Sequence, residues 1–184
     1  MGTRLTSAFL LGLAALLLVR CGGEPAAPRS TPKPNEIQKA RVAAPAFNAD
    51  SAYAYIAQQV AFGPRVPNTP EHVACGGWLS SELTRHGADV IEQPGLVRAY
   101  DGTILRIRNF IGQFRPENRK RILLFAHWDT RPFADKDTLR MREPIDGAND
   151  GGSGVGVLLE ITRLLGADST LDVGVDIVFF DAED

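Results

Sequence analysis

The chain has 184 residues, of which 44% are hydrophobic and 23% are charged, with a formal net charge of −2 at pH 7. This composition is ordinary for a soluble globular protein. It shows neither the strongly basic balance of a nucleic-acid-binding protein nor an acidic tail. We therefore expect one folded domain and no nucleic-acid partner.

Residues 1–20 have the pattern of an export signal. Arg4 precedes an uncharged apolar run at residues 8–19, which is too short to span a bilayer but suits the core of a signal peptide. Cys21 follows in the place of the lipidated first residue of a bacterial lipoprotein, although Arg20 departs from the small residue expected before it. We expect export to the periplasmic side of the cell envelope, with a lipid anchor on Cys21 or secretion without one. A buried N-terminal helix is the remaining alternative.

Residues 21–48 are rich in proline, serine, threonine and charged residues. Such a composition cannot bury enough apolar area to offset the entropy of ordering the chain. We interpret it as a tether to a domain at residues 49–184. The second cysteine, Cys75, is expected to be a small buried residue of a helix rather than a nucleophile or a disulfide partner.

Two helices are expected at the start of the domain. Asp50 is placed to cap a helix that ends at Phe62, and Thr69 followed by a proline begins a second helix that ends at Gly87. Gly76 and its neighbouring glycine lower the propensity of the second helix, and they predict a close approach to another element. His72 and His86 lie near the two ends of that helix, where we expect surface or capping roles.

The rest of the domain is expected to form strands around one helix. Residues 89–93 and 103–111 have the composition of strands, the second with one wet face. Residues 121–126 form an apolar run of the kind that a strand buried on both faces requires. Residues 153–165 carry an apolar stripe at helical spacing, and residues 173–180 form another apolar run. The last three segments predict a βαβ unit.

Acidic residues and one histidine follow the two strands of this unit and precede its helix. Because βαβ crossovers are right-handed, the carboxyl ends of both strands meet at one edge of the sheet, where His127, Asp129, Asp150, Glu183 and Asp184 can converge. One imidazole among several carboxylates is the ligand mix of a catalytic zinc site. The alternative is that Asp150 only favours the helix dipole and the last acids are a solvated strand end. The joint pattern favours the metal site.

Three blocks of sequence resemble one enzyme family. Ala-His-Trp-Asp-Thr-Arg-Pro at 126–132, the glycine-rich block at 147–160 and Phe-Phe-Asp-Ala-Glu-Asp at 179–184 resemble the zinc-dependent glutaminyl-peptide cyclotransferases. These are the animal-type enzymes and their bacterial relatives, which share a fold with zinc aminopeptidases. The resemblance also includes residues 62–67. It implies an α/β fold with a mixed, largely parallel central sheet flanked by helices, of which residues 49–184 form the N-terminal part.

The resemblance also implies roles for the acidic residues. Asp150 and Asp184 match the carboxylates that bind zinc, and Glu183 matches the neighbouring general base or acid. His127 and Asp129 match the family's His-x-Asp block. That histidine binds a second zinc in two-metal aminopeptidases but is not counted as a ligand in the cyclotransferases. Both residues are therefore candidates for a second metal or for supporting the ligands.

The expected reaction converts the N-terminal glutamine of peptides or proteins to pyroglutamate and releases ammonia, with one zinc ion as cofactor. The first alternative is a zinc aminopeptidase, which hydrolyses N-terminal residues and commonly uses two metals. The second is a tethered binding domain that has lost catalysis. Glu183 followed by Asp184, rather than by a second glutamate, favours the cyclotransferase.

The resembled family takes a histidine ligand, a further acidic residue and several strands from sequence beyond the point that corresponds to Asp184. Two carboxylates alone hold zinc poorly. We therefore expect this chain to be a piece of a longer protein, incomplete at its C-terminus and inactive by itself, with the third zinc ligand beyond Asp184. In such a piece we expect the strand at residues 173–180 to present an uncovered edge.

Overall fold

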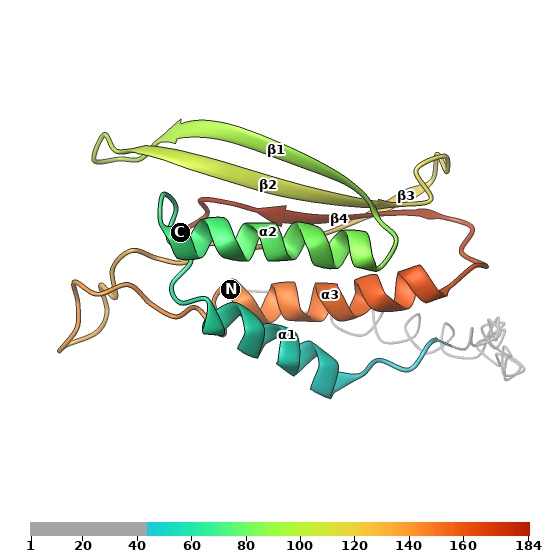
Figure 1. The fold of residues 1–184 in the computed structure, drawn as a ribbon, viewed down its shortest axis with the longest axis horizontal. Helices are drawn as coiled ribbons and strands as arrows, with labels where there is room; N and C mark the ends of the chain where they lie inside the picture. Colours follow the sequence, from blue (N-terminus) through green and yellow to red (C-terminus); the bar gives the residue numbers. More distant parts are fainter. Residues whose placement is uncertain (1–43) are drawn as a thin grey trace, which may run out of the picture. The chain divides into compact units, whose positions relative to one another are not determined.

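The computed structural model describes residues 44–184, which form one four-stranded sheet and three helices (Figure 1). The predicted signal peptide, Cys21 and most of the proline-rich tether lie outside the described residues. In chain order the elements are α1 (Ala49–Ala61), α2 (Pro70–Arg85), β1 (Asp89–Arg98), β2 (Ile104–Phe114), β3 (Arg121–His127), α3 (Gly152–Ala167) and β4 (Gly174–Phe180). No helix within residues 44–184 has the length and apolar character needed to cross a bilayer.

The first two helices begin at side-chain caps. Thr69 Oγ1 accepts the amide of His72 at 3.2 Å, and a proline occupies the first turn of α2, as predicted. Helix α1 begins at Asn48, whose Oδ1 accepts the amide of Ser51 at 3.0 Å. The prediction that Asp50 caps this helix is wrong, because Asn48 already supplies the cap and Asp50 lies in the first turn.

The sheet has the strand order β1-β2-β4-β3. Strands β3 and β4 run parallel and are connected through α3, so the predicted βαβ unit is confirmed. The pairings of β1 with β2 and of β2 with β4 are antiparallel. The prediction of a mixed α/β sheet flanked by helices is confirmed; among the described strands, only β3 and β4 pair in parallel.

Strands β1 and β3 form the two edges of the described sheet, and β4 lies inside it. Because β4 pairs with β2 on one side and with β3 on the other, the prediction of an uncovered edge at residues 173–180 is wrong. The expectation that β3 is buried on both faces is also wrong, because the described helices lie on only one face of the sheet (Figure 1). The β3 side chains Ile122, Leu123 and Phe125 are all half exposed or more.

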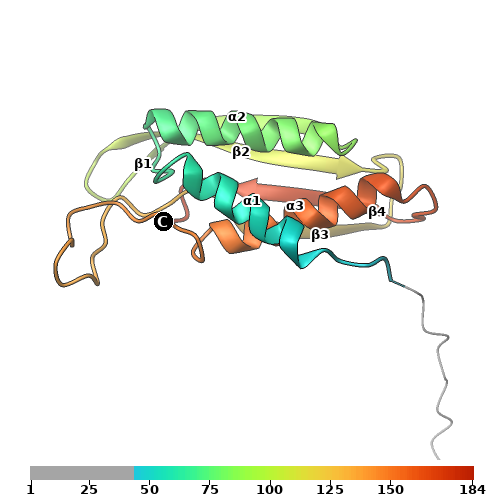
Figure 2. The same ribbon diagram turned by 60° about the horizontal axis from the view of Figure 1, so that its bottom comes forward.

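The helices pack on one face of the sheet in two layers. Helices α2 and α3 lie against the strands, and α1 packs on the outer side of α3 (Figure 2). A side chain at Gly156 would come within 2.8 Å of the backbone oxygen of Ala52, so glycine there lets α1 and α3 approach closely. The fully buried core side chains between the helices and the sheet include Leu79, Leu83, Phe110, Trp128, Val155, Leu159, Ile177 and Phe179.

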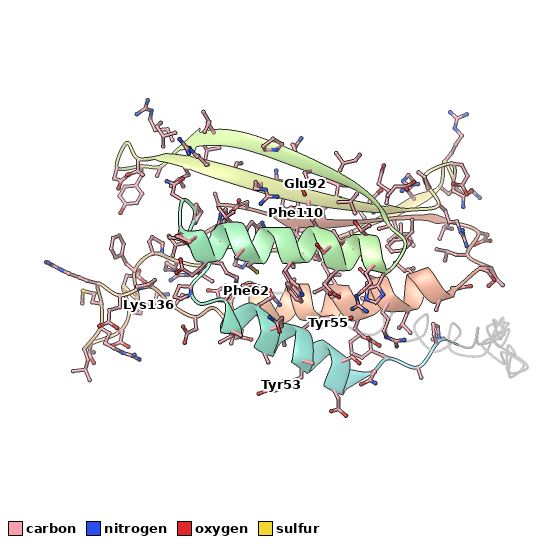
Figure 3. The ribbon with its side chains drawn as sticks, viewed as in Figure 1. Tyr53, Tyr55, Phe62, Glu92, Phe110 and Lys136 are labelled. Carbon is pink, nitrogen blue, oxygen red and sulfur yellow. The ribbon has the colours of Figure 1, made fainter. Side chains whose placement is uncertain are left out.

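Helix α2 contacts the sheet at Gly76, which confirms the predicted close approach for that glycine, whereas a Cβ atom on Gly77 would meet nothing within 4 Å. A Cβ atom on Gly76 would lie 3.0 Å from Cζ of Phe110 and 3.1 Å from the ring of Trp128. Figure 3 shows Phe110 between β2 and α2. The neighbouring Cys75 is fully buried, and burial raises the pKa of its thiol to about 12. The expectation of an inert, small buried cysteine is therefore confirmed.

Candidate metal centre

The predicted site residues come together at the carboxyl ends of β3 and β4. His127 ends β3, Asp150 precedes α3, and Asp184 follows β4. One ligand atom from each of these three residues lies within 4.8 Å of the others. Nε2 of His127 is 3.3 Å from Oδ1 of Asp150, and its Nδ1 is 3.8 Å from Oε2 of Glu183.

A glycine before α3 leaves room for Asp150 to approach His127. Gly151 has φ +76°, in the left-handed region that side chains disfavour. A Cβ atom there would lie 2.9 Å from the backbone oxygen of Asp129 and 3.2 Å from Cε1 of His127. The turn before α3 can therefore lie directly against the end of β3, which places the Asp150 carboxylate beside the imidazole.

Asp129 supports the site through its buried side chain. The two oxygens of that side chain accept the backbone amides of Glu183 and Asp184, each at 3.2 Å. Burial raises the pKa of Asp129, and the hydrogen bond from the Glu183 amide opposes that rise. Both carboxylate oxygens are thus committed to holding the chain after β4, so Asp129 lies in a supporting position within this cluster.

The two acids after β4 have very different environments. The Asp184 side chain is 4% exposed and lies within the cluster, whereas the Glu183 side chain is 62% exposed. Ala182 before them adopts φ +59°. The pair therefore offers one buried carboxylate for a metal and one accessible carboxylate for a bound molecule.

Arg65 is a structural support that the sequence pattern did not single out. Its guanidinium is fully buried and donates to the backbone oxygens of Trp128 (3.0 Å), Asp146 (2.8 Å) and Gly147 (2.8 Å). These oxygens belong to the end of β3 and to the turn before Asp150. Arg65 therefore links the two segments that carry His127 and Asp150. Its position within the family-like block at residues 62–67 was the only signal for it.

A second arginine was also missed. Arg131 lies in the long loop after β3, among several other charged residues, and its place in the family-like block at residues 126–132 was the only signal for it. NH2 of Arg131 lies 3.0 Å from Oδ1 of Asp184 and 3.3 Å from Oδ2 of Asp150. Hydrogen bonding to Asp184 raises the pKa of Arg131, which keeps the guanidinium charged.

The role expected for His72 is wrong, whereas that of His86 is confirmed. His72 is 1% exposed, its ring stacks on Trp128 at 4.3 Å, and its Nε2 lies 2.9 Å from Oδ2 of Asp181. His86 is the C-cap residue of α2, and its Nε2 is 3.0 Å from the hydroxyl oxygen of Tyr55. Long-range packing of α2 against the end of β4 buries His72, which helical position alone did not predict.

The donor set fits a divalent cation such as zinc. An imidazole and two carboxylates are typical zinc ligands, and three protein ligands leave a position open for a reactant. Oδ2 of Asp184 and Nδ1 of His127 are buried without a hydrogen-bond partner among the described residues. Buried polar atoms are normally paired, so the Asp184 oxygen has unused capacity to bind a metal, whereas Nδ1 of His127 lies 3.6 Å from Oδ1 of Asp129.

A cavity of about 270 Å³ opens beside the cluster. Its walls include Asp184 from the site, Pro132 and Phe133 from the loop after β3, and Tyr100 and Leu105 from the β1–β2 hairpin. The mainly apolar wall next to a group of carboxylates is the usual character of a small-molecule or peptide site.

The chain resembles known proteins over this same region. Residues 109–184 match peptidase family M28. The structure of Tannerella forsythia glutaminyl cyclase is 60% identical with a TM-score of 0.74, and the match covers 76% of this chain and 48% of that one. A Zn-dependent exopeptidase from Parabacteroides distasonis is 62% identical with a TM-score of 0.74, covering 77% and 49%. Bacteroides thetaiotaomicron glutaminyl cyclase bound to N-acetylhistamine is 57% identical with a TM-score of 0.75, covering 77% and 49%.

The fold and these likenesses define a protein of the zinc aminopeptidase-like class, which confirms the resemblance noted in the sequence. The match to peptidase family M28 lies in residues 109–184, and the similar structures include glutaminyl cyclases and Zn-dependent exopeptidases. It spans about half the length of these relatives. The comparison with curated proteins gave no match.

Proposed function

We propose that the protein is a zinc-dependent glutaminyl-peptide cyclotransferase, which converts the N-terminal glutamine of peptides or proteins to pyroglutamate and releases ammonia. The observation that carries the proposal is the pairing of a buried Asp184 in a metal-binding cluster with an exposed Glu183 beside it. The likeness to bacterial glutaminyl cyclases at up to 60% identity supports the same reaction.

The reaction needs one proton acceptor and one electrophile. Glu183 takes a proton from the α-amine of the substrate and returns it to the leaving ammonia, because its carboxylate is accessible and stands at the edge of the cluster. A bound zinc ion would polarise the side-chain amide carbonyl that the amine attacks. The nucleophile is already tethered to the electrophile, so no activated water is required.

We propose that one zinc ion is bound by Asp150 and Asp184, together with a histidine supplied from beyond Asp184. In this arrangement His127 lies beside the metal, and Asp129 holds the chain that carries the ligands. Three such ligands would leave a bound zinc ion with a position open for the substrate amide.

An aminopeptidase is the second candidate, and the position of His127 favours it. Because a nitrogen of His127 lies within 4.8 Å of carboxylate oxygens of Asp150 and Asp184, this histidine is placed to act as a metal ligand, as it does in the two-metal aminopeptidases. A Zn-dependent exopeptidase is also 62% identical over the matched region. A binding domain without catalysis remains a third candidate, which predicts no turnover of any peptide.

We also propose that the protein acts outside the cytoplasm. The apolar run at residues 8–19 followed by Cys21 supports export and a lipid anchor, with secretion as the alternative. The cavity beside Asp184 supports a peptide substrate, because its mainly apolar walls suit the residue that follows an N-terminal glutamine.

Mass spectrometry of a glutamine-initiated peptide after incubation with the intact protein tests the proposed reaction. Loss of ammonia supports the cyclotransferase, and loss of the whole first residue establishes the aminopeptidase instead. An unchanged peptide with a zinc-loaded, folded protein would rule out both reactions for that substrate. Metal analysis of the same sample provides an independent readout: one zinc per chain for the cyclase and two for the peptidase.

A further inference from the structure

We propose that Arg131 is a positioning residue that holds both metal-binding carboxylates so that each presents a single oxygen to the metal. The inference rests on the metal site of the proposed function. It adds a role for a side chain that is not itself a metal ligand.

The hydrogen bonds of Arg131 divide the four carboxylate oxygens into two groups. Its Nε and NH2 donate to Oδ1 of Asp184 at 3.2 and 3.0 Å, and NH2 also donates to Oδ2 of Asp150 at 3.3 Å. The two remaining oxygens, here called the inner oxygens, make no hydrogen bond to Arg131: Oδ1 of Asp150 lies 3.3 Å from Nε2 of His127, and Oδ2 of Asp184 is buried without a partner among the described residues. Arg131 thus occupies the outer oxygens and leaves the inner ones for a cation.

Arg131 is itself held through its side chain and through its backbone. Its NH1 donates to Oδ1 of Asp135 at 3.2 Å, and its backbone oxygen accepts the amide of Ile145 at 3.3 Å. The side chain is one-third exposed. A guanidinium with fixed, planar donors can contact two carboxylates at once, which a lysine ammonium does with less directional control.

The positive charge of Arg131, like its hydrogen bonds, favours the arrangement of the two carboxylates. Asp150 and Asp184 carry like charges that repel at the separations of this cluster, and one cation between their outer oxygens offsets that repulsion. The opposing interpretation is that the guanidinium competes with a metal for the carboxylates. The two interpretations predict opposite changes in metal affinity when Arg131 is replaced.

The test is the zinc dissociation constant of the intact protein, measured by competition with a chromophoric chelator after the metal has been removed. Arg131→Met should weaken zinc binding by roughly 10- to 100-fold, the range found when a residue that orients a ligand is lost. Arg131→Lys should restore part of the affinity. Arg140→Met is the matched control, because Arg140 is exposed in the same loop and makes no side-chain hydrogen bond or ion pair within residues 44–184. Its affinity should be unchanged.

Zinc binding by Arg131→Met that is as tight as in the unsubstituted protein, or tighter, would overturn the proposal, and tighter binding would establish competition. Circular dichroism of the metal-free variants separates these results from misfolding. If Arg131→Met does not fold, Arg131→Lys decides: weakened binding supports the proposal, and unchanged binding overturns it. An unsubstituted protein that binds zinc but does not cyclise glutamine contradicts the proposed function alone, because the affinity comparison remains valid. No zinc binding by the unsubstituted protein overturns both.

Discussion

The carboxylate of Asp129 accepts the backbone amides of both Glu183 and Asp184. One side chain from the end of β3 therefore sets the direction of the chain that leaves β4. Because the two amides are fixed by the same group, Asp184 is directed into the cluster while Glu183 stays accessible. Asp129, the acid of the His-x-Asp block, therefore holds the residues that follow β4 rather than residues of its own loop.

Replacing Asp129 by alanine should weaken both the fold and the metal site. Two amides would lose their acceptor, and we expect the free energy of unfolding to fall by about 1–3 kcal/mol. Zinc affinity should fall as well, because the chain that carries Asp184 is released. Urea unfolding and zinc titration measure the two effects. The control is Asp172→Ala, an exposed acid that makes no side-chain hydrogen bond within the described residues; equal losses in both variants would contradict the assignment.

Asp150→Ala should abolish stoichiometric zinc binding. Its Oδ1 is one of the inner oxygens of the cluster, and no other carboxylate within residues 44–184 occupies that position. We expect a greater loss of affinity than the roughly 10- to 100-fold loss typical of residues that only support a ligand. Metal analysis of the purified variant measures this. An unchanged zinc content would show that Asp150 is not a ligand.

Glu183→Gln should separate catalysis from metal binding. The side chain is exposed and lies outside the three-residue cluster, so zinc content should be the same as in the unsubstituted protein. Removal of the proton acceptor should lower kcat for cyclisation of a glutaminyl peptide by about 10²- to 10⁴-fold. Retained turnover in the zinc-loaded variant would exclude Glu183 as the base.

Arg65→Met should destabilise the protein without removing any metal ligand. Three backbone oxygens would lose a buried charged donor, and we expect a loss of about 3 kcal/mol in the free energy of unfolding. The exposed Arg119 provides the control, since Arg119→Met removes a charge that makes no side-chain hydrogen bond within residues 44–184. Thermal unfolding of the two variants measures the difference, and equal midpoints would refute the proposed role of Arg65.

His86 should make the fold sensitive to mild acid. Burial lowers the pKa of His86, and the nearby Arg85 lowers it further. Below about pH 6.5, the ordinary pKa of histidine, the unfolded chain therefore binds a proton more readily than the folded one. Stability is lost as the pH falls through that value, until the folded form also titrates.

The matched variant is His86→Gln, which removes this titration and keeps a hydrogen-bonding group near Tyr55. Urea unfolding midpoints measured above and below about pH 6.5 should drop less in His86→Gln than in the unsubstituted protein. Acids that titrate in the same range contribute equally to both proteins, so the difference isolates His86. The same drop in both would show that His86 is not responsible.

Much of the fold and site was predictable because the signals were local. Thr69 and the following proline determine the start of α2 through hydrogen bonding and a fixed φ, independently of what the helix contacts. The apolar runs of β3 and β4 around an amphipathic α3 determine a parallel βαβ unit, and its handedness brings Asp150 and Asp184 to one sheet edge.

The tertiary structure alone decided which side chains meet across long sequence separations. Arg65 binds backbone oxygens more than sixty residues away, and His72 pairs with Asp181. Arg131 forms ion pairs with Asp150 and Asp184. Such contacts depend on how the helices pack on the sheet, and the spacing of residues in the sequence does not predict that packing. The amino-acid sequence therefore determined the elements and the candidate ligands, and the tertiary structure determined which residues support them.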